Sequence, residues 1–285
     1  GNEPKAIEFD EEDTGNGDGE DPDNGDDTVE DEIYFKENFY YTGTEADCFT
    51  DWTGTNSSLG IATAVSDANI SVSVVADSEN TALHINRPVS TDGGGDKYKV
   101  DARFPAAAGW SDNATFMDAY ADKSIVYQFK FKPVQMASFN VMLRCRHDAD
   151  GDGTQNTLMP SMFSIKVNGE VKAFGQVISQ SFEAGTWYDV ALVCNFTDGS
   201  AAIYINGTKV EGDFTIPSYE MLTDETAQLN PLLRFADLGN STDTAIEYYL
   251  DDIRIYDGNE PKAIEFDEED IGNGDGEDPD NGDDT

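Results

Sequence analysis

Two nearly identical acidic segments bracket the chain and restrict where a folded body can form. Residues 1–28 and 258–285 differ at one position, Thr14 against Ile271, at a constant offset of 257 residues. Each copy holds 12 acidic residues and a single Lys, so the pair supplies −22 of the formal charge of −41. Segments this poor in apolar side chains and this rich in like charge do not form a core. We therefore predict a connector, a folded body over residues 29–257 and a second connector.

Recurrence of a segment at a fixed offset is typical of one period cut from a tandem array. The predicted repeat is one acidic connector plus one folded body, 257 residues long. A cloning artefact is the alternative, although a copied tag would be identical in both places. The sequence thus predicts neighbouring copies of the same module as partners, arranged as a stalk or a filament.

The connectors carry oxygen ligands of the kind that Ca²⁺ prefers. Residues 18–27 alternate carboxylates with Gly, Asn and Pro, and the candidate ligands are Asp18, Asp21, Asp23 and Asp26. The frame of a complete EF-hand loop is missing, because Thr14 stands where an Asp is needed. We expect Ca²⁺ to neutralise these segments and stiffen them; a plain solvated spacer is the alternative.

Three hairpin signals predict that the body is built from β-strands. Asn168-Gly169, Asp198-Gly199 and Asn206-Gly207 each stand between strand-like runs. Asn-Gly and Asp-Gly favour the positive φ angles of tight turns that match the twist of paired strands. We found no segment of ten residues with convincing helical periodicity, so the predicted class is all-β.

Alternation along two runs predicts an inward and an outward face for each strand. In 124–132 the residues Ile125, Tyr127, Phe129 and Phe131 share one face; in 139–146 the inward set is Phe139, Val141, Leu143 and Cys145. With 38% hydrophobic residues the chain can bury a sizeable core. The predicted fold is an antiparallel β-sandwich flanked by acidic connectors.

Several segments resemble the laminin-G-like, concanavalin A-like jelly rolls. They are 185–193 (GTWYDVALV) followed by Asp198-Gly199 and 203–207 (IYING), the opening run 33–39 with Trp52, and the closing run 249–256. The resemblance spans roughly residues 32–256 and implies a jelly-roll sandwich whose first and last strands are these two runs. It implies little about function, because lectins, adhesins and some glycosidases share the fold.

Two further calcium sites are predicted in the body. The loop 148–156 places Asp148, Asp150, Asp152, Thr154 and Asn156 at the positions of a D-x-D-x-D-G calcium loop, although Met159 stands where the bidentate Glu belongs. A polar hairpin tip is the alternative for this loop. The second site, Glu37 with Asp252, rests on the jelly-roll resemblance, since related sandwiches hold a structural Ca²⁺ between their first and last strands.

The residues do not favour catalysis. The paired carboxylates of a retaining glycosidase are absent as a motif, and the chain has only two His, His84 and His147. His84 lies in a strand-like run and is expected to be a strand residue rather than a base. We therefore expect a protein that is not an enzyme, with a glycoside hydrolase or lyase as the least favoured alternative.

A carbohydrate-binding module that recognises an acidic glycan is the main alternative function. Sugars stack on aromatic rings, and Trp110 in the loop 106–113 is the best candidate platform. Trp187 is expected to point outward beside Lys166 and Tyr204, although a structural role for this ring is equally open. Strand alternation places five cations on one predicted outward face that would dock a glycan or a neighbouring connector: Lys130, Lys132, Arg144, Arg146 and Lys166.

Composition also bears on location and partners. Six sequons suit an extracellular glycoprotein: Asn56, Asn69, Asn113, Asn195, Asn206 and Asn240.

Cys145 and Cys194 follow the inward parity of their strands, which favours buried thiols over a disulfide between them. The net charge of −41 repels nucleic acid, and no apolar run approaches the ~18 residues that span a bilayer.

Together these features predict a non-catalytic structural or adhesive module of an extracellular, cell-surface tandem repeat. Its connectors are expected to bind Ca²⁺, and its sandwich to serve as the repeating body.

Overall fold

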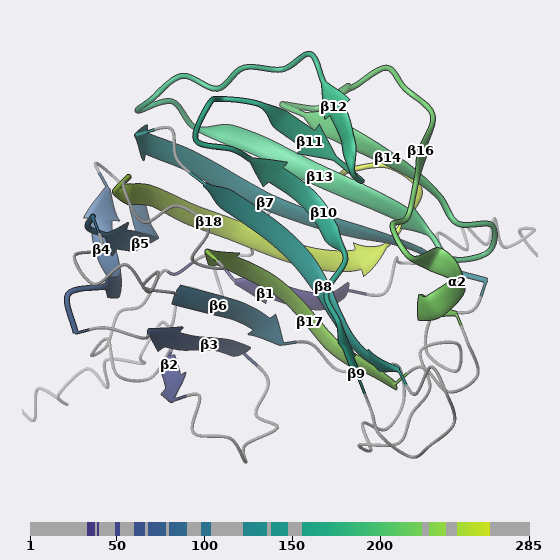
Figure 1. The fold of residues 1–285 in the computed structure, drawn as a ribbon, viewed down its shortest axis with the longest axis horizontal. Helices are drawn as coiled ribbons and strands as arrows, with labels where there is room; N and C mark the ends of the chain where they lie inside the picture. The colour runs from purple at the N-terminus through teal and green to yellow at the C-terminus, as the bar shows by residue number, and fades with distance from the viewer. Residues whose placement is uncertain are drawn as a thin grey trace, which may run out of the picture. The chain divides into compact units, whose positions relative to one another are not determined.

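The computed structural model describes residues 33–37, 39, 49–51, 60–65, 68–77, 80–89, 98–103, 122–135, 138–147, 156–223, 228–237 and 244–262. These residues form two β-sheets, sheet A and sheet B, stacked as a sandwich (Figure 1). The only helix among them is the single turn α2 (Tyr219–Leu222). The prediction of an all-β sandwich is confirmed. Residues 1–28 and 263–285 lie outside the described parts of the chain.

Sheet A has the strand order β15-β14-β13-β7-β18-β5-β4, with β1 beside β18 and β16 beside β14. Its strands are β1 (Ile33–Glu37), β4 (Ser71–Asp77), β5 (Asn80–Arg87), β7 (Ser124–Gln135), β13 (Tyr188–Asn195), β14 (Ser200–Ile205), β15 (Thr208–Lys209), β16 (Phe214–Thr215) and β18 (Ile246–Asp257).

Sheet B has the order β12-β11-β10-β8-β17-β6-β3-β2, with β9 beside β8. Its strands are β2 (Phe49–Asp51), β3 (Gly60–Val65), β6 (Tyr98–Arg103), β8 (Phe139–His147), β9 (Asn156–Leu158), β10 (Ser161–Ile165), β11 (Val171–Ala173), β12 (Gln176–Ile178) and β17 (Gln228–Asp237). The described strand pairs are antiparallel except β2 with β3, which is parallel.

All three predicted hairpins are present. Gly169 turns β10 into β11 at φ 81°, and Gly199 turns β13 into β14 at φ 77°. Asn206 and Gly207 both take positive φ, 51° and 73°, between β14 and β15. Asn206-Gly207 has positive φ at both central residues, as Asn-Gly favours, whereas the other two turns take positive φ at the Gly alone.

The core lies between the sheets and is rich in aromatic rings. Phe129 of sheet A meets three rings of sheet B, with its centroid 5.2 Å from that of Phe235, 6.4 Å from Phe139 and 6.5 Å from Phe163. The inward alternation predicted for β7 is confirmed, because Ile125, Tyr127, Phe129 and Phe131 all belong to this core. Phe139, Val141 and Leu143 of β8 also lie there, as predicted.

The first and last strands of the sandwich are neighbours. Lys36 of β1 stands opposite Arg254 of β18, and Ile33 stands opposite Tyr256. β5 pairs with the first half of β18 and β1 with the second half, so both lie along the same edge of β18 (Figure 1). The body therefore begins and finishes at the same end of sheet A.

Candidate functional site

The predicted basic face does not exist as one surface. Lys130 and Lys132 lie on β7 of sheet A, whereas Arg144 and Arg146 lie on β8 and Lys166 directly after β10, both of sheet B. The prediction of a shared face was wrong because alternation fixes which way a side chain points within a sheet but not which sheet its strand joins. The five cations are thus divided between the two layers.

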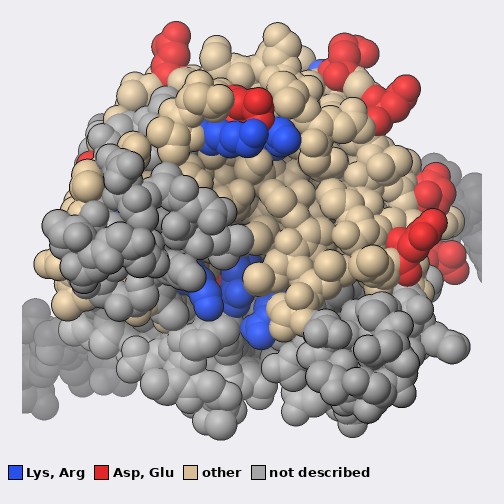
Figure 2. Space-filling model, viewed as in Figure 1, with Lys and Arg blue, Asp and Glu red and all other residues tan. Residues whose placement is uncertain are grey.

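Sheet B carries its own group of charges and a cavity beside them. Lys166 and Lys172 both pair with Glu170, and a cavity of about 420 Å³ next to them is lined by Ser138, Asn140, Ser164, Ile165, Lys166, Val167 and Asn168. Figure 2 shows this side of the molecule: among the described residues, Lys and Arg gather within the face and most Asp and Glu stand along its rim. The lining offers amide, hydroxyl and ammonium groups to a polar ligand.

Sheet A presents a cation among aromatic rings on its outer face. The Nζ of Lys132 lies 4.3 Å from the ring centroid of Tyr249 and 5.0 Å from that of Trp187. His84 stacks on Tyr249 with centroids 4.6 Å apart, and its Nε2 lies 3.0 Å from Oε1 of Glu247. We call these five residues the aromatic cluster; they come from β5, β18, β7 and the residue before β13.

The aromatic cluster is half-buried, and every member retains some exposure. Trp187 points outward as predicted, but its neighbours are Lys132 and Tyr249 rather than Lys166. Tyr249 and Glu247 were missed by sequence reasoning. Alternation along β18 places both side chains on the outer face. Their contacts with Lys132 and His84, however, depend on the strand order β7-β18-β5 within sheet A. His84 is a strand residue of β5, as predicted.

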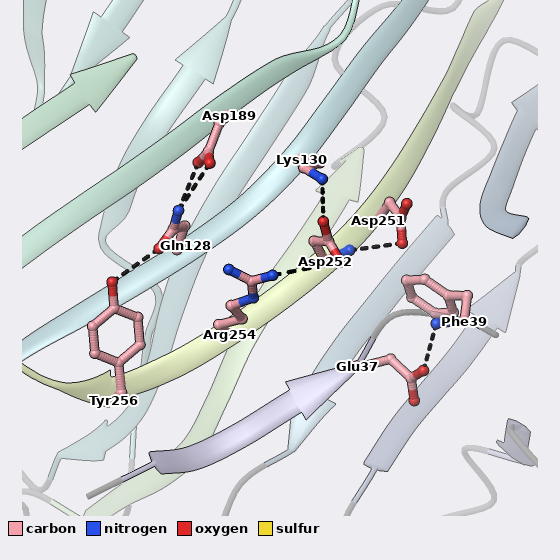
Figure 3. Close-up of polar contacts among 9 residues, drawn as sticks. All are labelled: Glu37, Phe39, Gln128, Lys130, Asp189, Asp251, Asp252, Arg254 and Tyr256. Atoms are coloured by element: carbon pink, nitrogen blue, oxygen red, sulfur yellow. Dashed lines mark hydrogen bonds and ion pairs between the residues drawn. The ribbon is translucent and has the colours of Figure 1, made fainter. Parts of the chain in front are cut away.

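Next along β7, a bulge in β18 brings Asp252 to Lys130. The register of β18 against β7 shifts between Asp251 and Arg254, and Asp252 takes a left-handed φ of 46°. Its backbone N–H donates to Oδ1 of Asp251 at 2.8 Å. The Asp252 carboxylate pairs with Lys130 and lies 3.8 Å from a guanidinium nitrogen of Arg254 (Figure 3). Asp252 is thus neutralised by two cations of the same sheet.

Glu37, the other half of the calcium site implied by the resemblance, lies on β1 opposite Ile253. Its Oε1 accepts a hydrogen bond of 2.7 Å from the backbone N–H of Phe39 (Figure 3). The paired strands do place Glu37 and Asp252 on neighbouring segments. Among the described residues, no three His, Cys, Asp or Glu side chains are grouped as metal ligands. The calcium assignment stays a prediction.

A polar network of Gln128, Asp189 and Tyr256 lies on the outer face of sheet A. Gln128 donates to both carboxylate oxygens of Asp189, at 3.0 Å and 2.9 Å, and accepts a hydrogen bond of 2.9 Å from the Tyr256 hydroxyl (Figure 3). Burial raises the pKa of Asp189, and the hydrogen bond from Gln128 opposes that rise. Gln128 lies between the inward residues Tyr127 and Phe129, so alternation places it on the outer face. The segment Gly258–Lys262 shares this face, and Gln128 is buried there.

Many predicted site residues fall on parts of the chain outside the described residues. These are Asp18, Asp21, Asp23, Asp26, Trp110, Asp148, Asp150, Asp152, Thr154, Asn56, Asn113 and Asn240. Asn156 opens β9 and Arg146 lies on β8, but their side chains are also outside the described set.

The remaining sequons lie at turns and strand ends. Asn69 and Asn206 are exposed, and Asn195 is half-buried. The Oδ1 of Asn195 accepts from the Thr197 N–H at 2.9 Å, and that of Asn206 accepts from the Asp189 N–H at 2.9 Å. Whether any of them carries a glycan stays a prediction.

Cys194 is a buried free thiol on β13 of sheet A, as the alternation predicted. Burial raises the pKa of this thiol far above its usual range. Cys145 lies on β8 of sheet B. The described thiol at Cys194 is therefore a small apolar core group rather than a nucleophile.

No protein-family model and no curated protein sequence matches the chain. Among solved structures, a sialidase aligns at 16% identity and a TM-score of 0.49, over 78% of this chain and 18% of its own. A protein of unknown function with a galectin-like fold from Bacillus subtilis aligns at 10% identity and 0.42, over 79% and 95%. A CBM22-1 xylan-binding domain from Paenibacillus barcinonensis aligns at 11% and 0.35, over 80% and 95%. The chain thus spans under a fifth of the sialidase's length.

Proposed function

We propose that this chain is a non-catalytic structural module of an extracellular tandem array, in which acidic connectors join successive sandwiches. The observation that carries the proposal is the pairing of the first and last strands, with Ile33 opposite Tyr256. The chain therefore enters β1 and leaves β18 at the same end of the body. The near-identity of the two connectors is the evidence that the module repeats.

This arrangement implies a particular kind of array. Because the chain enters and leaves the body at adjacent points, the body adds little to the end-to-end distance of the array. Each sandwich then projects from the connector path, and the connectors set the spacing of the array. An extended chain covers at most about 3.5 Å per residue, so a connector of this size reaches at most about 100 Å. Repulsion between its carboxylates favours extension at low ionic strength.

Calcium is the proposed regulator of that spacing. Each connector carries 12 acidic residues in 28 positions. Binding of Ca²⁺ by carboxylate oxygens removes much of the repulsion and fixes the backbone around each ion. In this proposal the ion turns an extended, self-repelling spacer into a defined joint. The surface array is the adhesive or structural element, and glycans or neighbouring modules are its partners.

Limited proteolysis of the full chain, with and without Ca²⁺, tests the proposal. Cleavage within residues 10–28 should slow when Ca²⁺ is added and recover with EDTA. The matched control replaces Asp18, Asp21, Asp23 and Asp26 by Asn, which keeps the polarity and removes the charge. Its cleavage should not respond to Ca²⁺. Equal cleavage of the unsubstituted chain in Ca²⁺ and EDTA, or images of the native protein without repeated bodies, would overturn it.

A second candidate function, glycan binding, is favoured by the aromatic cluster. Tyr249 and Trp187 supply aromatic rings, and Glu247 and His84 supply hydrogen-bonding groups beside them. Rings flanked by polar side chains are what the apolar face and hydroxyls of a pyranose require. Lys132 adds a positive charge, which suits an acidic sugar.

A glycan-array screen, followed by titration of any hit, tests this second candidate. Trp187→Ala and Tyr249→Ala should each weaken saturable binding at least about tenfold. Lys166→Ala, on the opposite sheet, is the control and should bind as the unsubstituted chain does. Absence of a saturable hit, or a hit lost with Lys166→Ala alone, would exclude the aromatic cluster as the site.

A further inference from the structure

The first five residues of the second connector are built into the sandwich. The Gly258 N–H donates to the Ser124 carbonyl at 2.9 Å, which continues the pairing of β18 with β7 beyond Asp257. The Lys262 N–H donates to the Tyr256 hydroxyl at 2.8 Å. The segment Gly258–Lys262, which we call the clasp, is thus tied to sheet A at both of its ends.

The clasp packs beside a small apolar cluster on the outer face of sheet A. That cluster consists of Val126, Ala191, Val193 and Tyr256, and Tyr256 is only 1% exposed. A Cβ on Gly258 would lie 3.4 Å from both the Tyr256 ring and Val126, so the backbone of the clasp runs close to both. Outer faces of sheets ordinarily meet water, and an apolar cluster there needs a cover.

Polar groups complete the contact between the clasp and the sheet. A cavity of about 230 Å³ lies between them, lined by Gln128, Asp189 and Arg254 from the sheet and by Pro261 and Lys262 from the clasp. The Tyr256 hydroxyl bridges the two sides, since it accepts from the Lys262 N–H and donates to Oε1 of Gln128. The clasp and the outer polar network therefore form one unit.

Residues 1–5 of the chain have the same sequence as the clasp, Gly-Asn-Glu-Pro-Lys. We propose that residues 1–5 form the same clasp on the Tyr256 surface of a preceding copy of this chain. This inference rests on the proposed tandem array and deepens it. The start of each connector belongs to the module before it, so the structural repeat ends at Lys262 rather than at the sequence boundary. The free spacer between modules is the remaining acidic stretch.

Amide hydrogen exchange in two proteins tests the inference. One is the present chain; the other carries an additional copy of residues 1–257 in front of it. The Lys262 amide should be protected in both. The Lys5 amide that follows the added copy should exchange about tenfold more slowly than Lys5 of the single chain, and approach the rate of Lys262. Equal exchange of Lys5 in the two proteins would overturn the inference.

A substitution in the added copy identifies the acceptor. Tyr256→Phe there removes the hydroxyl that the clasp uses and should return Lys5 to the rate of the single chain. Tyr249→Phe on the same strand is the matched control and should leave Lys5 protected. Protection that survives Tyr256→Phe would contradict the assigned contact. The outcome is independent of the calcium test, because a connector that ignores Ca²⁺ can still form the clasp, and a calcium-responsive connector can lack it.

Discussion

The Tyr34 hydroxyl donates a hydrogen bond of 3.0 Å to Oδ2 of Asp257, 223 positions further along the chain. Lys123 joins them: its Nζ donates to the Tyr34 hydroxyl at 2.7 Å and lies 3.3 Å from the same Asp257 oxygen. The three residues stand on β1, at the end of β18 and just before β7. They tie together the points where the chain enters and leaves the sandwich.

Removing the Tyr34 hydroxyl should destabilise the sandwich. Tyr34→Phe keeps the ring, which Lys123 approaches to 5.3 Å, but leaves Asp257 without this donor. We expect a loss of about 1 kcal/mol in the free energy of unfolding, measured by urea denaturation. Tyr249→Phe, on the outer face of β18, is the control and should change stability by less than about 0.5 kcal/mol. Equal effects of the two substitutions would show that this contact adds nothing.

The same contact predicts a loss of stability in alkali. Burial, together with Asp257, raises the pKa of Tyr34 from 10.0 to about 12, against the lowering effect of Lys123. Because the folded pKa lies above the unfolded one, the stabilisation is complete below about pH 10 and falls as the pH rises through about 12. Tyrosinate absorbance should report the raised pKa, and Tyr34→Phe should flatten the alkaline decline in stability. An unchanged decline would assign it to other groups.

The raised pKa of Asp189 predicts how the stability of the sandwich changes with pH in the acidic range. Burial raises its pKa, so its contribution to stability is greatest at pH values below the ordinary 3.8 and is lost as the pH rises through its folded pKa. Asp189→Asn removes this titration and keeps an oxygen for Gln128. The free energy of unfolding of the variant, relative to the unsubstituted chain, should therefore be more favourable near neutral pH than near pH ~3. A difference that does not vary with pH would contradict the raised pKa.

The aromatic core predicts a large cost for a single truncation. Phe129 is fully buried and meets rings of sheet B on three strands. Phe129→Ala should cost about 3–5 kcal/mol of unfolding free energy. Val177→Ala, at a side chain that is 63% exposed, should cost less than about 0.5 kcal/mol. Comparable denaturation midpoints for the two variants would contradict the packing between the sheets.

Two glycines at hairpin turns separate backbone strain from steric overlap. Gly169 has φ 81° and no neighbouring atom within 4 Å of the position of an added Cβ, whereas a Cβ on Gly199 would lie 2.8 Å from the Tyr219 ring. That ring is held by its hydroxyl, which donates to the Phe196 carbonyl at 2.8 Å. Gly169→Ala should cost about 1–2 kcal/mol through the left-handed backbone alone. Gly199→Ala should cost about 1–3 kcal/mol more in thermal or urea unfolding. Equal costs would mean that Tyr219 moves freely.

Local features of the fold could be predicted because they depend on residues that are adjacent in the sequence. Asn168-Gly169 and Asp198-Gly199 specify turns through their own φ preferences. The inward and outward faces of β7 follow from the two-residue period of a strand, whatever its neighbours are. The meeting of the first and last strands was implied by the jelly-roll resemblance, and the pairing of β1 with β18 agrees with it.

The candidate sites depend on strand order and register, which alternation does not encode. Lys130 and Arg144 have the same outward parity, yet they lie on different sheets. The bulge at Asp252 reverses the alternation of β18 halfway along the strand, and no turn residue announces it.

The sequence by itself determined the two near-identical acidic segments, the turns and the inward face of β7, since charge, φ preference and side-chain period are properties of short segments. Only the tertiary structure decided that Tyr34 meets Asp257, that Lys132 meets Tyr249 and that the connector begins on the sandwich. Those contacts join residues distant in sequence, and they are selected by the packing of one sheet on the other, which no short segment specifies.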